Sequence, residues 1–293
     1  MTRTMTREPA VPVAEKQVAA KPDQVIGEAP DPHLSPVNRL AVALDFPSAV
    51  RALEFVDRLE GTCRWFKVGL ELYYAAGNPL IETLRARGFE VFLDLKLHDI
   101  PNTVAGAVHS VARTGAALLT LHAGGGEAMI RAAAEAASLA GADAPRLLAV
   151  TVLTSMDQAE LHATGVNATP AHQVLRLARM AQRSGGSSIG MVCSAEEAAL
   201  LQAELTPGTM LVVPGIRPAG VEVGDQRRIA TPASAIAAGA TMLVVGRPIT
   251  QAANPADAAS AILDEIVQAS SKSELSVVRS QEKPQRPSRS TEN

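Results

Sequence analysis

Short apolar segments alternate with amphipathic, alanine-rich segments over most of the chain. Each apolar segment has the length of a strand, and most are continuous rather than alternating. Continuous runs of this kind are typical of parallel strands that are buried on both faces. The eight runs cover residues 40–44, 65–68, 91–95, 117–121, 147–153, 188–192, 210–213 and 242–245.

Apolar positions between and after these runs recur with a helical period and predict eight helices. The predicted helices cover residues 48–59, 78–87, 103–114, 127–140, 171–184, 195–204, 232–238 and 255–269. Residues that favour a helix start stand before several of them, at Ser48, Ser194, Thr231 and Asn254. Glycines that favour a helix end follow others, at Gly61, Gly88, Gly115, Gly141, Gly185 and Gly239.

Eight strands that alternate with eight helices within about 230 residues predict an α/β fold, a single-domain (β/α)8 TIM barrel. The alternative is an open, doubly wound parallel sheet, in which a glycine-rich turn usually follows the first strand. Here the first strand is followed by Asp45, Phe46 and Pro47, so the barrel is favoured.

The two ends of the chain differ from this body. Residues 1–36 are rich in proline, and residues 270–293 are rich in serine, lysine, arginine and proline. Neither end has an apolar period that could form a core. We therefore predict a flexible N-terminal extension over residues 1–36, a barrel catalytic domain over 37–269 and a flexible C-terminal tail over 270–293.

Composition excludes several classes of partner. The 293 residues carry a net charge of −3, and only 3% of them are aromatic, so neither a basic footprint nor a stacking platform for nucleic acid is expected. No apolar run reaches the roughly 18 residues of a membrane span, and the N-terminus lacks an apolar signal core. We expect a cytoplasmic protein without nucleic-acid or membrane partners, in which Cys63 and Cys193 are buried, reduced thiols.

Polar residues follow seven of the eight predicted strands. In a barrel of this kind, the carboxyl ends of the strands meet at one mouth, where catalytic residues lie. The residues at these ends include Asp45, Lys67, Asp94, Lys96, Asp99, His122, Thr154, Ser155, Arg217 and Arg247. One polar residue at a strand end carries little information, but so many at one mouth indicate a site.

The most specific local pattern is the run from Asp94 to Thr103. Asp94 and Lys96 lie two residues apart and therefore share a face of the strand, and Asp99 follows. Carboxylates on both sides keep a lysine protonated, which favours a general acid over a Schiff-base nucleophile. Asp45 and Lys67 form a second pair of opposite charges. The alternative for both pairs is a structural salt bridge at the mouth of the barrel.

A candidate anion site follows the last two strands. Gly246 and Arg247 stand after the eighth strand and Arg217 after the seventh, where barrels commonly bind phosphate. Gln226 is a candidate neutral donor, and the glycine-containing loop 219–224 is a candidate lid.

Three other polar features receive no catalytic role. Arg227 and Arg228 are interpreted as a solvated surface pair. The glycines after His122 fit a tight turn as well as they fit a phosphate cradle, and His98 is interpreted as structural. No cluster of histidine, cysteine and acidic residues has the spacing of a zinc site, so no metal is predicted.

Taken together, these motifs resemble the orotidine 5′-phosphate decarboxylase family in its bacterial form. The resemblance runs from about residue 40 to residue 250. It is carried by Leu44-Asp45, Phe66-Lys67-Val68-Gly69, the Asp94–Thr103 run, Leu153-Thr154-Ser155, Pro214–Pro218, Gly224–Arg228 and Val245–Ile249. The family makes UMP and CO2 from orotidine 5′-phosphate and uses no metal or organic cofactor.

The resemblance implies a role for each matched residue. Lys96 is similar to the family's proton donor to C6 of the pyrimidine, and Asp94 to the carboxylate set against the substrate carboxylate. Asp99 and Thr103 are similar to residues that reach the site of a neighbouring subunit, which implies a homodimer. The expected substrate ligands are Asp45 and Lys67 at the ribose, Thr154, Ser155 and Pro214 near the pyrimidine, and Arg217, Gln226, Gly246 and Arg247 at the phosphate.

Two alternatives remain open. Decarboxylases and synthases acting on other sugar phosphates share an Asp-x-Lys-x-x-Asp pattern but use Mg2+. The other alternative is an inactive barrel that binds a nucleotide as a sensor or scaffold.

Overall fold

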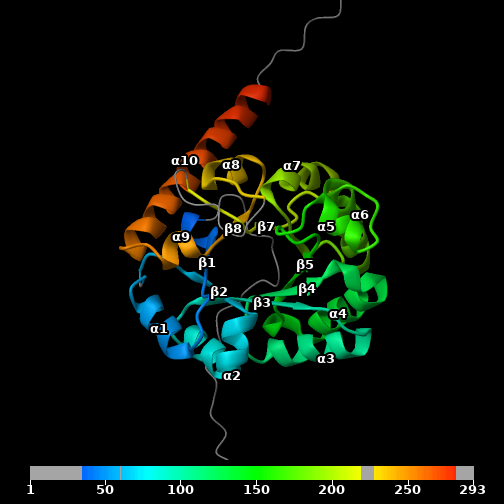
Figure 1. Cartoon of the computed structure of the whole chain (residues 1–293), viewed down its shortest axis with the longest axis horizontal. Helices are drawn as coiled ribbons and strands as arrows, with labels where there is room; N and C mark the ends of the chain where they lie inside the picture. Colours follow the sequence, from blue (N-terminus) through cyan, green and yellow to red (C-terminus); the bar gives the residue numbers. More distant parts are fainter. Residues whose placement is uncertain (1–34, 60, 219–227, 282–293) are drawn as a thin grey trace, which may run out of the picture.

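Eight parallel strands form a closed barrel that is surrounded by helices (Figure 1). The computed structural model describes residues 35–59, 61–218 and 228–281. Every strand pairs in parallel with the next, and β1 (Leu40–Ala43) pairs with β8 (Met242–Val245), which closes the ring. The predicted (β/α)8 barrel is thus confirmed, and the open sheet is excluded.

The remaining strands all lie at or close to the predicted runs. They are β2 (Trp65–Gly69), β3 (Glu90–Leu97), β4 (Leu118–His122), β5 (Arg146–Val150), β6 (Gly190–Val192) and β7 (Leu211–Val213). The α-helices are α1 (Ala49–Asp57), α2 (Leu70–Ala86), α3 (Pro101–Ala112), α4 (Gly126–Ala140), α5 (Gln158–Ala163), α6 (Pro170–Gly185), α7 (Ala195–Glu204), α8 (Pro232–Ala237), α9 (Arg247–Thr250) and α10 (Pro255–Gln281). Three short 3-10 helices are η1 (Pro36–Asn38), η2 (Ala123–Gly125) and η3 (Gly141–Asp143).

Several helices differ from their predicted bounds. α2 begins directly after β2 and is interrupted at Gly77, whose φ of 62° and ψ of −160° are not helical, so only its second part was predicted. α5 was not predicted, although the capping box between Asp157 and Glu160 marks its start. α6 ends one residue later than expected, because Gly186 adopts the positive φ of 80° at its end.

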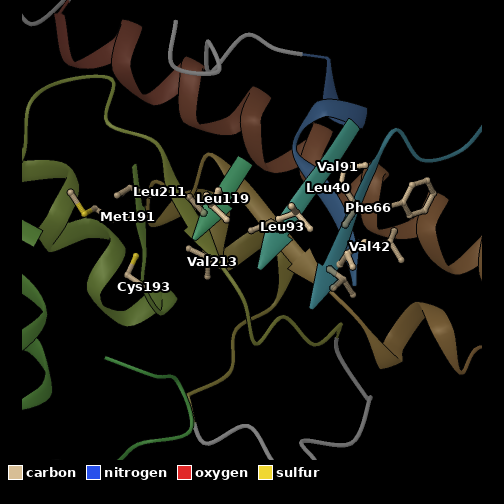
Figure 2. Packing of buried hydrophobic residues seen from close by; sticks show 14 of the residues in the cluster. Leu40, Val42, Phe66, Val91, Leu93, Leu119, Met191, Cys193, Leu211 and Val213 are labelled. Atoms are coloured by element: carbon tan, nitrogen blue, oxygen red, sulfur yellow. The ribbon is translucent and has the colours of Figure 1, made fainter. Parts of the chain in front are cut away.

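Two layers of apolar residues hold the barrel together. One fills the inside of the ring and includes Ala41, Phe92, Leu148 and Val212. The other lies between the strands and the helices, and Figure 2 shows part of it, including Phe66. Because strand residues alternate in direction, continuous apolar runs supply both layers at once.

Both cysteines are buried, as predicted, and both belong to the outer layer. Cys63 and Cys193 are free and buried, and burial raises the pKa of the Cys63 thiol to about 12. Burial also raises the pKa of Cys193, so both thiols stay protonated at neutral pH.

The C-terminal helix continues past residue 269. α10 runs to Gln281 and projects from the ring of helices (Figure 1). The buried Arg39 ties it to the barrel, since its guanidinium donates hydrogen bonds to Ser270 Oγ at 2.6 Å and to the Ala240 carbonyl at 2.7 Å. The boundary expected at 269 is therefore too early for this helix. Residues 1–34 and 282–293 lie outside the described chain, so the two flexible ends stay predictions.

Over the described ranges, no helix is both long enough and apolar enough to cross a bilayer.

Candidate active site

The carboxyl ends of the strands surround a pocket of about 530 Å³. Its floor is apolar and includes Phe92, Val150 and Val212. Its polar lining contains most of the residues predicted for the site, which are Asp45, Lys67, Asp94, Lys96, Thr154, Ser155, Pro214, Arg217, Gly246 and Arg247. Seven strand ends thus contribute to one cavity, which is how catalytic residues are usually arranged in this fold.

A chain of alternating charges crosses one side of this pocket. Lys96 Nζ lies 2.8 Å from Asp94 Oδ1, and Lys67 Nζ lies 3.5 Å from Asp94 Oδ2. Lys67 Nζ also lies 3.4 Å from Asp45 Oδ1. Asp94 is therefore shared by two ammonium groups, and Lys67 connects it to Asp45.

Besides the two lysines, Thr120 also binds Asp94. This threonine was not among the predicted site residues. Its hydroxyl donates to Asp94 Oδ1 at 3.0 Å and accepts a hydrogen bond from the Lys96 backbone N–H at 2.9 Å. Thr120 is fully buried in β4. The available signal was a polar residue inside an otherwise apolar strand, which costs free energy unless it is hydrogen-bonded.

Electrostatics keep Asp94 ionised. Burial opposes ionisation and by itself raises the pKa of this carboxyl. The charges of Lys67 and Lys96 and the hydrogen bonds from Lys96 and Thr120 outweigh that effect and hold the pKa below its usual value. The site therefore presents a fixed anion next to two cations.

The backbone at Lys96 departs from a regular strand. The pairing of β3 with β4 shifts register between Leu93 and Leu97, and Lys96 has a φ of 49°. We expected Asp94 and Lys96 to share a face because of regular alternation. They do meet, but through a bulge that Thr120 holds by its hydrogen bond to the Lys96 N–H.

Two glycines leave room for the charged groups. A Cβ atom at Gly69 would lie 3.0 Å from Lys67 Nζ, and one at Gly246 would lie 3.4 Å from Asp45 Oδ2. Gly246 was predicted for its approach to phosphate, whereas the importance of Gly69 for space appears only in the structure.

The two arginines of the candidate anion site lie on the opposite side from α3, after β7 and β8. Arg217 is buried and donates to the Ile216 carbonyl at 2.8 Å, and Arg247 is exposed at the start of α9. The Arg217 N–H also donates to the Ala230 carbonyl at 2.9 Å. Gln226 and the candidate lid at 219–224 lie outside the described residues.

The interpretation of Arg228 as a solvated residue is wrong. Its side chain is only 9% exposed and forms an ion pair with Glu197, whose side chain is 4% exposed. It was misread because a run of two arginines near glycines has the composition of a surface loop. Arg227 lies outside the described residues.

Asp99 and Thr103 do not line the pocket. Both are exposed at the start of α3, and Asp99 Oδ1 accepts a hydrogen bond from the Ile100 N–H at 2.6 Å. Within one chain, the structure therefore does not bring Asp99 to Lys96.

The two histidines of this region also stay outside the pocket. His98 and His122 stack with ring centroids 5.3 Å apart, and neither lines the cavity. Burial, together with the nearby His98 and Lys96, lowers the pKa of His122. That neither residue is catalytic stays a prediction.

Comparisons with known proteins identify the family to which this chain belongs. Residues 38–262 match the sequence model of the orotidine 5′-phosphate decarboxylase / HUMPS family. The orotidine 5′-phosphate decarboxylase of Halorhodospira halophila is 54% identical over 232 residues, which are 79% of this chain and 97% of that protein. The enzyme of the same name from Vibrio campbellii is 49% identical over 229 residues, or 78% of this chain and 97% of that protein.

Solved structures agree with the fold. The crystal structure of orotidine 5′-phosphate decarboxylase from Lactobacillus acidophilus has a TM-score of 0.68 and 38% identity, covering 78% of this chain and 98% of that one. The structure from Pyrococcus horikoshii has a TM-score of 0.62 and 26% identity, covering 78% and 99%. The chain is therefore an enzyme, and it belongs to the orotidine 5′-phosphate decarboxylase / HUMPS family.

Proposed function

We propose that the protein is a homodimeric, cytoplasmic carboxy-lyase that converts orotidine 5′-phosphate to UMP and CO2 without a cofactor. The observation that carries this proposal is the Lys96 ammonium, which faces the pocket and is held by Asp94 at 2.8 Å. Relatives with about half of their residues identical carry the name of this activity.

Binding of the substrate divides among three groups of residues. Arg217, Gln226, Gly246 and Arg247 hold the phosphate, since arginine binds phosphate oxygens in a bidentate manner. Asp45 and Lys67 bind the ribose hydroxyls. Thr154, Ser155 and Pro214 surround the pyrimidine.

The reaction breaks the bond between C6 and the carboxylate. The electron pair stays on C6, CO2 leaves, and Lys96 donates a proton to C6 to give UMP. Lys96 then regains a proton from solvent. A fixed ammonium stabilises the developing charge without reorganisation during the step. The ionised Asp94 lies against the departing carboxylate and favours its loss as neutral CO2.

Asp99 and Thr103 act in the site of the second subunit. Both side chains are exposed in a single chain and stand beside Ile100, which is 67% exposed, so they lie open to a second subunit. Asp99 of one subunit then completes the Asp94, Lys96 and Lys67 group of the other.

The test is the loss of ultraviolet absorbance of orotidine 5′-phosphate when purified protein is added in EDTA. We expect conversion to UMP, with no increase in rate when Mg2+ replaces EDTA. A folded sample that converts nothing in EDTA but acts on a sugar phosphate with Mg2+ would favour the metal-dependent members of the family. A sample that binds UMP and catalyses neither reaction would favour an inactive nucleotide-binding barrel.

A further inference from the structure

The Arg228 side chain, which is only 9% exposed, lies outside the pocket and joins three segments of the barrel mouth. Its Nη1 pairs with Glu197 of α7. Its Nη2 donates to the Leu153 carbonyl at 2.9 Å and to the Val152 carbonyl at 3.3 Å. These two carbonyls lie just before Thr154 and Ser155, which line the pocket.

The carboxylate that holds Arg228 is itself fixed. Glu197 Oε2 accepts a hydrogen bond from the Ser194 N–H at 3.0 Å, which belongs to the capping box of α7, and another from the Ser194 hydroxyl. Ser194 is 1% exposed and follows Cys193, a residue of the pocket wall. Because Ser194 and Glu197 are both buried and are hydrogen-bonded to each other, the carboxylate that pairs with Arg228 has a fixed position.

The backbone after Arg228 is tied to the segment that follows β7. The Ala230 carbonyl accepts from the Arg217 N–H at 2.9 Å, and Ile216 and Ala230 form a parallel bridge. The side chain of Arg228 therefore contacts the loop that leads to Thr154. The backbone two residues later, at Ala230, pairs with the segment that carries Arg217.

We propose that Arg228, held by Glu197, is a positioning residue that sets the distance between the loop leading to Thr154 and Ser155 and the wall that carries Arg217. This inference rests on the proposed function, in which Thr154 and Ser155 contact the pyrimidine and Arg217 the phosphate. A nucleotide must satisfy both contacts at once, so the spacing of the walls decides whether C6 lies at Lys96.

The chemistry of the Arg228–Glu197 ion pair supports a role in positioning the pocket walls rather than a role in stabilising the fold. A buried ion pair is often no more stable than an apolar pair of the same size. A guanidinium, unlike an ammonium, has planar donors that can bind a carboxylate and two carbonyls at the same time. Arg228 Nε is buried without a hydrogen-bond acceptor among the described residues, which is a cost of this placement.

Four variants test the inference by kinetics with orotidine 5′-phosphate and by unfolding in denaturant. Arg228→Met removes the carbonyl contacts but leaves Glu197 buried and unpaired. The double variant Arg228→Met with Glu197→Gln also removes the negative charge of Glu197, while the glutamine oxygen still accepts a hydrogen bond from Ser194. Arg228→Lys keeps the charge and loses the planar donors. Arg179→Met is the matched control, because Arg179 pairs with Glu204 at the surface, where their side chains are 48% and 38% exposed.

We expect kcat/KM to fall by about tenfold to a hundredfold in Arg228→Met, in Arg228→Lys and in the double variant. Arg228→Lys and the double variant should be more stable than Arg228→Met. Inhibition by ribose 5-phosphate, which lacks the base, should change by less than about twofold while the KM for the nucleotide rises. Arg179→Met should behave as the wild type.

Recovery of wild-type kcat/KM in the double variant would overturn the inference, because Arg228 would then only neutralise Glu197. Wild-type kinetics in Arg228→Lys would overturn it as well. The wild type in the same series decides the proposed function separately: turnover by the wild type upholds it whatever the variants do, and no turnover overturns both.

Discussion

Lys96 has a positive φ, which is uncommon for a residue with a side chain. Its φ of 49° places it in the left-handed region, and such conformations cost roughly 1–3 kcal/mol and persist only where the surroundings enforce them. Here Thr120 binds the Lys96 N–H, and Asp94 binds its ammonium. Two directed contacts thus fix one side chain at the mouth of the barrel.

Replacing Lys96 with alanine should abolish nearly all turnover while the fold is kept. The variant removes the proposed proton donor, and its side chain is 33% exposed, so packing loses little. Lys272→Ala on the exposed part of α10 is the matched control. Steady-state kinetics and the unfolding midpoint are the measurements, and a kcat close to that of the wild type would contradict the assigned role.

Asp94 should stabilise the fold less in acid. Its pKa is lowered in the folded protein, so its contribution is complete above the unfolded value of about 3.9 and is lost as the pH falls through the folded pKa. Asp94→Asn should therefore destabilise the protein at pH 7, where it leaves two lysines without their shared anion.

Denaturant unfolding of the wild type and Asp94→Asn at pH 7, 5, 4 and 3 tests this expectation. The difference in the free energy of unfolding should be constant between pH 7 and 5 and should shrink below about pH 4. If the difference in the free energy of unfolding grew as the pH fell, the pKa of Asp94 would be raised in the folded protein, which contradicts this expectation.

At the scale of elements, the junction of β2 and α2 sets the position of Lys67. Gly69 is the last residue of β2 and lies at a φ of −90°, which alanine tolerates. Its importance is the space it leaves, since an added Cβ would lie 3.0 Å from Lys67 Nζ.

Gly69→Ala should therefore reduce kcat/KM by about tenfold and change the free energy of unfolding by less than about 1 kcal/mol. Gly61→Ala is the opposite control, because Gly61 has a φ of 85° and no neighbour within 4 Å of an added Cβ. It should lower stability and leave kcat/KM unchanged. The position of Lys67 would not depend on Gly69 if Gly69→Ala had wild-type kinetics.

At the scale of the whole molecule, one chain forms the pocket but leaves Asp99 outside it. Residues from seven strand ends of one chain line the pocket, whereas Asp99 and Thr103 are exposed at the start of α3. A two-fold symmetric dimer can bring such residues to a second site, because the same surface is used on both subunits.

A hybrid dimer tests this arrangement. Subunits with Lys96→Ala and with Asp99→Asn, each inactive as a homodimer, are co-expressed with different tags and purified as the hybrid. If Asp99 acts across the interface, one of the two sites has neither change, and the hybrid should have about half the wild-type activity. If Asp99 acts within its own subunit, both sites carry a defect and the hybrid stays inactive.

The amino-acid sequence was enough to predict the eight strands, most of the helices and most of the polar residues that line the pocket. Continuous apolar runs predicted the strands because both faces of a barrel strand are buried, and strand ends marked the mouth because parallel strands all point one way. Motifs supplied the family, which the comparisons bear out. The individual roles of the site residues remain predictions.

The closed barrel decides which distant polar groups meet. Thr120 of β4 reaches Asp94 of β3, and Arg228 reaches Glu197 of α7 and the Leu153 carbonyl, although the partners lie 26 to 75 residues apart in the sequence. The bulge at Lys96 depends on the neighbouring strand β4, and the space at Gly69 depends on where the Lys67 side chain lies. Local patterns specify which residues are buried, but closure of the barrel determines which partner each buried polar group finds.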